Sequence, residues 1–139
     1  MAHVNKSTVT LRIKGEMLIP SEITTMLGSE SSFEQIKDQI LVNKKTGKER
    51  ISKFGMWALK VFDCEPENIE KQVLEIFSKL TNDKKTWEYL GSNFKVELFC
   101  GIFMKYENEG MGISPLVMKI LSERKIELSI DIYGGKDDD

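Results

Sequence analysis

The chain has 139 residues, 40% of them hydrophobic and 30% charged, and its 20 basic and 22 acidic side chains give a net charge of −2. This length and composition are typical of one folded domain and exclude a disordered chain. A general nucleic-acid binder carries a positive balance or a basic stripe, so the charge argues against nucleic acid as a partner.

The first predicted elements are a strand and a short helix. Apolar and polar residues alternate over residues 8–14, the period of a half-buried strand. A helix follows Pro20 with Ser21 as its N-cap, and Gly28 ends it. Residues 29–46 mix helical spacing with loop-forming residues and predict no definite element.

The middle of the chain predicts strand and then helix. Residues 49–61 contain one or two strands, interrupted near Gly55. The clearest helix covers residues 66–80, because one apolar stripe runs along it at helical spacing. A second short helix is expected over residues 84–90.

The last third predicts two strands around a helix. Residues 94–106 form a long strand with an apolar side and a mixed side. Ser114 caps a helix that has Pro115 at its first position. The final strand alternates over residues 126–133, and its buried face is expected to consist of Ile126, Leu128, Ile130 and Ile132.

Together these elements predict a single α+β domain over residues 1–139, with flexible ends at 1–7 and 134–139. Amphipathic strands alternating with helices favour a two-layer sandwich, in which a mostly antiparallel or mixed sheet has its helices on one face. A ferredoxin-like or split βαβ arrangement fits this order. A parallel doubly wound sheet is disfavoured, because its strands would be apolar on both faces.

The sequence contains no recognisable catalytic or metal site, and we expect no cofactor. The single histidine is His3, and neither Cys64 nor Cys100 lies at metal-ligand spacing, whereas a zinc site needs about four such ligands. Cys100 lies inside an apolar strand, where a cysteine acts as a small hydrophobe. Gly110 and Gly112 precede a helix, which is only a weak signal for anion binding.

The protein is expected to be cytosolic and not to bind membranes. No apolar run approaches the roughly 18 residues that span a bilayer. Residues 1–7 are polar and lead directly into a strand, which is not the pattern of a signal peptide.

The side of the sheet without helices is the candidate binding site. Aromatic rings beside charges are typical of interfaces, which favour aromatic and arginine anchors. The alternative is that residues 29–46 fold over this side and bury its rings as core. The residues expected there are Arg12, Trp57, Glu97, Phe99, Phe103, Asp131 and Tyr133.

Three of these residues also allow a second hypothesis. Arg12, Glu97 and Asp131, if they converge, would suit acid–base chemistry or the binding of a small polar ligand. The simpler interpretation is a set of cross-strand salt bridges on a solvated face, and we favour it over catalysis.

Several short motifs, in order along most of the chain, resemble one known family. It is the bacterial domain-of-unknown-function family numbered four-two-seven-nine. The resemblance implies a bacterial, stand-alone cytosolic domain and transfers no catalytic residues; residues 29–48 match it least. The motifs are residues 11–16 (LRIKGE), Pro20, Ile23-Thr24, Leu27-Gly28, Gly55-Met56-Trp57, Val96-Glu97-Leu98-Phe99, Ile113-Ser114-Pro115 and Ile130-Asp131-Ile132-Tyr133.

Our first hypothesis is therefore a non-enzymatic protein-binding domain. Small domains of this kind often act as immunity proteins that neutralise a cognate toxin, which is an argument by analogy. The alternatives are the ligand-binding or enzymatic use of Arg12, Glu97 and Asp131, and a self-associating module that pairs through a sheet face or an edge strand. The oligomeric state expected is a monomer or a homodimer, and the self-associating module requires the homodimer.

Overall fold

The computed structural model describes residues 2–135. The flexibility expected of Met1 and residues 136–139 therefore concerns residues outside the described range. The helices are α1 (Pro20–Leu27), α2 (Ile69–Ser78), α3 (Lys84–Asn93) and α4 (Pro115–Glu123). The strands are β1 (Ala2–His3), β2 (Lys6–Gly15), β3 (Phe33–Gln35), β4 (Ile40–Val42), β5 (Glu49–Ile51), β6 (Gly55–Lys60), β7 (Lys95–Phe103), β8 (Glu109–Gly110) and β9 (Glu127–Tyr133).

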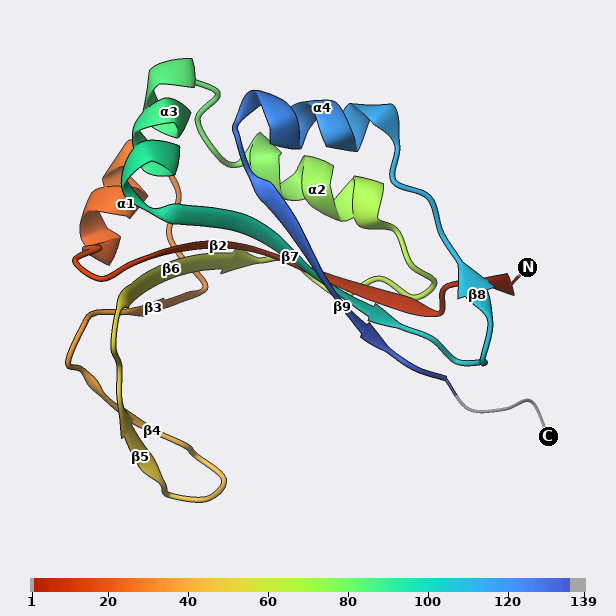
Figure 1. Ribbon diagram of the computed structural model, residues 1–139, viewed down its shortest axis with the longest axis horizontal. Coiled ribbons are helices and arrows are strands. Elements are labelled where there is room, and N and C mark those ends of the chain that lie inside the picture. The colour runs from red at the N-terminus through yellow and green to blue at the C-terminus, as the bar shows by residue number, and fades with distance from the viewer. Residues whose placement is uncertain (1, 136–139) are drawn as a thin grey trace.

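The main sheet has five strands in the order β3-β6-β2-β7-β9, and the helices lie on one side of it (Figure 1). Strand β2 runs antiparallel to both β6 and β7, whereas β7 and β9 are parallel. β6 and β7 are therefore parallel to each other with β2 inserted between them, and the chain joins them through α2 and α3. This is a split βαβ unit in a mixed sheet, and the α+β class is confirmed.

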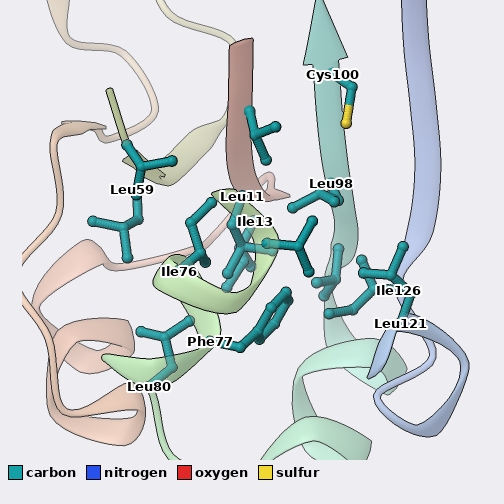
Figure 2. Close-up of a cluster of buried hydrophobic side chains, with 14 of the residues drawn as sticks. Leu11, Ile13, Leu59, Ile76, Phe77, Leu80, Leu98, Cys100, Leu121 and Ile126 are labelled. Carbon is teal, nitrogen blue, oxygen red and sulfur yellow. The ribbon is translucent and has the colours of Figure 1, made fainter. Parts of the chain in front are cut away.

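The core lies between the sheet and the helices. In β2, alternate residues from Ser7 to Ile13 are buried, as the period of two predicts. Figure 2 shows side chains of β2, β6 and β7 meeting those of α2 and of the α4 segment. The labelled members of this cluster are Leu11, Ile13, Leu59, Ile76, Phe77, Leu80, Leu98, Cys100, Leu121 and Ile126.

The helix starts follow capping chemistry, with one exception. The side chains of Asn68, Asp83 and Ser114 accept hydrogen bonds from backbone N–H groups in the first turns of α2, α3 and α4. In α1 the prediction of Ser21 as N-cap is wrong. The helix already begins at Pro20, whose fixed φ suits a first helical position and whose missing N–H needs no cap.

Residues 29–46 contain two short strands, β3 and β4. β4 and β5 make a hairpin that projects on the side of the sheet opposite the helices (Figure 1).

The expectation of a free N-terminal segment is not met over residues 2–7, where β1 pairs with β8 and Val4 is buried. Ser7 Oγ donates to Gln72 Oε1 at 2.6 Å inside the core, which ties β2 to α2.

The predicted buried face of the last strand is only half correct. Ile126 is buried and Leu128 is partly covered, but Ile130 and Ile132 are 44% and 67% exposed. They lie on the helix side of the sheet, yet β9 is an edge strand that runs out from under the helix layer (Figure 1). Alternation fixed which way these side chains point but could not show how far the helices extend.

Gly55 is required by a close backbone approach at the start of β6. A Cβ atom at this position would lie 2.2 Å from the carbonyl oxygen of Leu18. We expect Gly55→Ala to lower the free energy of unfolding by about 2 kcal/mol, because the backbone must shift to admit the methyl group. Urea denaturation measures this, and Gly112→Ala, which meets no atom within 4 Å, should leave stability within about 0.5 kcal/mol of the wild type. Equal midpoints for the two variants would contradict the steric explanation.

Candidate functional site

One face of the main sheet is not covered by helices, and we call it the outer face (Figure 1). The strand registers place its side chains in rows across the sheet, for example Arg12 opposite both Ala58 and Glu97. The face is defined by Lys6, Thr8, Thr10, Arg12, Lys14, Phe33, Met56, Ala58, Lys60, Lys95, Glu97, Phe99, Phe103, Glu127, Ser129, Asp131 and Tyr133.

Glu97 forms the centre of a charged cluster on this face. Its side chain is 4% exposed, and Arg12 Nη2 and Lys14 Nζ lie 2.8 and 3.2 Å from Oε1. Lys95 Nζ lies 3.8 Å from Oε2, which also accepts a 3.0 Å hydrogen bond from Ser129 Oγ. Three cations thus share one buried carboxylate, so positive charge predominates in this part of the face.

The protonation of Glu97 reflects two opposing influences. Burial is the largest single influence and by itself would raise the pKa of this carboxyl group. The hydrogen bond from Ser129 and the positive charges of Lys14 and Arg12 together outweigh burial, and the pKa of Glu97 is lowered below its ordinary value. The carboxylate is therefore ionised at neutral pH.

The aromatic rings of the outer face are stacked with cations and with each other. The Arg12 guanidinium lies 4.0 Å from the centroid of the Phe99 ring, and Lys6 Nζ lies 4.4 Å from that of Phe103. Phe103 and Tyr133 stack with centroids 4.5 Å apart and planes 7° from parallel. Phe99 and Phe103 are half-buried and Tyr133 is exposed, so residues 29–46 do not bury these rings as core.

Trp57 does not belong to this face, and its predicted placement there is wrong. The β2–β6 register pairs it with Ile13, on the helix side, where it is 0% exposed. Its indole N–H donates to Thr24 Oγ1 of α1 at 3.0 Å. The alternation of residues 56–61 already places Trp57 on the side of Leu59 and Val61, both of which are buried, and so indicates the helix side.

Arg12, Glu97 and Asp131 do not form one cluster. Arg12 and Glu97 are paired with each other. Asp131 is exposed and lies opposite Gly101, whereas Glu97 lies opposite Glu127. Glu97 and Asp131 therefore do not form a carboxylate pair at one reaction centre, and Glu97 takes part in ion pairs with cations instead.

Several residues of the outer face were not among the predicted site residues. Lys14 and Lys95 complete the cluster at Glu97, Ser129 donates to its carboxylate, and Lys6 covers Phe103. The alternation in β2 and β7 would have indicated the three lysines. That Lys14 and Lys95 both reach Glu97 depends on how β2 and β7 are aligned with each other, and the sequence of a single strand does not show this alignment.

The remaining candidate groups are placed as follows. Cys100 is fully buried in β7, and burial raises the pKa of its thiol to about 12, so it behaves as a small hydrophobe. The pocket at the N-terminus of α4 is lined by Glu67 and Glu70, and Glu67 Oε2 lies 2.7 Å from His3 Nε2. Those carboxylates disfavour an anion there. Within residues 2–135, no three His, Cys, Asp or Glu residues gather as metal ligands.

No helix within the described part of the chain has both the length and the apolar character that crossing a bilayer requires.

Comparison with known proteins gives a family and no function. No curated protein and no solved structure matches the chain significantly. The model of one family, described as a domain of unknown function and designated DUF4279, matches residues 5–135. That match extends from β2 to just beyond β9 and so includes every strand of the main sheet. The chain therefore belongs to the DUF4279 family, as its motifs predicted.

Proposed function

We propose that this chain is a protein-binding module that binds an acidic surface of its partner on the outer face. The observation that carries the proposal is the cluster at Glu97, where Arg12, Lys14 and Lys95 surround one carboxylate. A partner that brings carboxylates would balance this charge, and complementary charge gives an interface its specificity and association rate.

The aromatic residues supply the apolar part of the same interface. Phe99 and Phe103 are held in place by cation stacking, and Tyr133 is stacked on Phe103. Rings that are already ordered lose little conformational entropy on binding, which is why pre-organised aromatic and arginine side chains contribute most of the energy of many interfaces.

The narrower form of the proposal is an immunity protein of the bacterial cytoplasm that occludes a cognate toxin. It rests on analogy with other small stand-alone domains, so the partner to test first is a toxic product of a neighbouring gene. Co-expression with the wild-type chain should restore growth, and the purified pair should form a complex in native mass spectrometry. If the wild-type chain binds no product of a neighbouring gene, the proposal that it is an immunity protein is overturned.

Thr10 provides the sharpest test of the outer face. It lies between Lys60 and Phe99 in the middle of the face. We expect Thr10→Glu to weaken partner binding at least about tenfold, because it adds a negative charge where the partner is acidic. Thr10→Lys, of similar size, should retain binding, and Thr25→Glu on the exposed surface of α1 is the matched control. Isothermal titration with the purified partner measures all three.

The outcomes separate the two parts of the proposal. Equal losses with Thr10→Glu and Thr10→Lys would contradict the acidic character of the partner. Loss of binding with Thr25→Glu, while both Thr10 variants bind normally, would place the interface on the helix layer and overturn the proposal. Circular dichroism of each variant verifies that the fold is kept.

A further inference from the structure

Strand β9 is a free edge of the main sheet. It is seven residues long and pairs with β7 one residue to one, without a bulge. Natural edge strands commonly avoid further pairing by being short, by carrying proline or charged side chains, lysine above all, or by bulges. β9 has no proline, lysine or bulge, and its two charged residues, Glu127 and Asp131, both lie on the outer side of the sheet. β3 at the opposite edge is only three residues long. Within residues 2–135, no other strand pairs with the free side of β9.

The backbone of β9 shows which groups are free. The Tyr133 carbonyl accepts a hydrogen bond from Met104 N–H at 3.0 Å, so Tyr133 directs its backbone groups toward the β7 side. Because this direction alternates along a strand, Leu128, Ile130 and Ile132 direct their N–H and C=O groups away from β7. The same residues carry the exposed apolar side chains of β9, Ile130 and Ile132.

We propose that β9 binds β9 of a second copy of this chain, antiparallel and centred on Ile130. In this register Ile130 lies opposite Ile130 of the second copy, and Leu128 lies opposite Ile132. Apolar side chains then meet apolar side chains on the helix side, and each outward N–H and C=O finds a partner. On the outer side Ser129 meets Asp131, and Glu127 meets Tyr133.

Charge selects this register over its neighbours. A shift by two residues in one direction places Glu127 opposite Asp131 of the second copy. A shift in the other direction places Asp131 opposite its own copy. Like charges directly opposite each other destabilise a strand pair, and of these three registers only the one centred on Ile130 avoids both contacts.

The pairing has a defined geometry and a limited strength. A two-fold axis perpendicular to the sheet puts both helix layers on the same side and joins the two outer faces into one surface. About seven residues on each side are far fewer than the roughly 20–30 of a standard interface. We therefore expect a dimer that dissociates in the micromolar range or above, and that leaves the outer face open to other partners.

Sedimentation equilibrium from low micromolar to near-millimolar concentration tests the pairing. The wild-type chain should pass from monomer to dimer in this range. Tyr133 provides a register-specific pair of variants, because Tyr133→Glu and Tyr133→Lys lose the same stacking on Phe103 but place opposite charges against Glu127 of the second copy. The dissociation constant should be about tenfold higher for Tyr133→Glu than for Tyr133→Lys, and the difference should shrink in high salt.

Two further variants locate the interface. Ile130→Pro removes an N–H that points away from β7, so it should abolish dimerisation while the monomer stays folded. Ile130→Lys should do the same through repulsion across the two-fold axis. Ile51→Lys makes the same change on the exposed β5 strand and should leave the dimer intact. A chain that is monomeric at every concentration, or a dimer that responds equally to both Tyr133 variants or to Ile51→Lys, would overturn the proposal.

Discussion

Replacing Trp57 with alanine should lower the free energy of unfolding by about 4 kcal/mol, the largest single-site loss that we expect in this protein. Trp57 is fully buried on the helix side of β6, where α1 packs against that strand. Truncation removes most of a large side chain from a close-packed site and leaves the hydroxyl group of Thr24 without its indole donor. Urea denaturation followed by far-ultraviolet circular dichroism measures the loss.

A milder variant separates packing from hydrogen bonding at the same site. Trp57→Phe keeps an aromatic ring but lacks the N–H group, and it should cost about 1–2 kcal/mol. Tyr133→Ala is the exposed aromatic control and should cost less than about 1 kcal/mol. Loss of partner binding by a Trp57→Phe chain of near wild-type stability would falsify the assignment of Trp57 to the core.

Glu97→Gln should lower the free energy of unfolding at neutral pH by about 2–3 kcal/mol, the second largest effect. The amide has almost the shape of the carboxylate, but it leaves Arg12, Lys14 and Lys95 close together without their counter-charge. Removing one partner of a buried ion pair costs about 3–5 kcal/mol. We expect less here, because the Arg12 and Lys14 side chains are 28% and 26% exposed and water screens part of their charge.

The effect should depend on pH with a defined sign. The pKa of Glu97 is lower in the folded chain than in the unfolded chain. Its contribution to stability is therefore fully present above the unfolded value of about 4.3 and is lost as pH falls through the lowered folded value. The stability difference between wild type and Glu97→Gln should be greatest near neutral pH and shrink below about pH 4.

Glu127 provides a matched control for the same chemical change. It lies opposite Glu97 in the β7–β9 register, is exposed, and has no ion pair within 4.0 Å among residues 2–135. Glu127→Gln removes a like charge beside Glu97 and should leave stability unchanged or slightly raised. If the two glutamine variants lose equal stability at neutral pH, the cluster at Glu97 does not stabilise the fold.

The two proposed interfaces use different parts of one sheet. The outer face offers stacked rings and cations, and the free edge of β9 offers backbone groups beside Ile130 and Ile132. The two interfaces can be tested independently, because Thr10 lies in β2 at the middle of the sheet and Ile130 lies in β9 at its edge. A dimer that keeps both outer faces open would present two binding surfaces side by side.

The sequence alone determined the local structure wherever a strong period was present. Strict alternation in β2 and an apolar side in β7 identified the faces of these strands, and the apolar stripe of α2 identified the side of that helix that is buried. The motifs around Gly55 and Ser114 are two of those that indicated the family, and the structure gives a physical reason for each: a backbone contact with Leu18 and an N-cap on α4.

The tertiary structure alone decided which residues meet. Asp131 and Glu97 point to the same face, but Asp131 lies opposite Gly101 and away from Glu97. The register between strands is set by the whole sheet and not by either strand. The exposure of Ile130 and Ile132 likewise depends on where α4 ends its cover of β9, which no residue of β9 encodes. The hydrophobic period of a strand or helix shows which way each side chain points, whereas the residues that pack against that side chain come from segments far away in the chain.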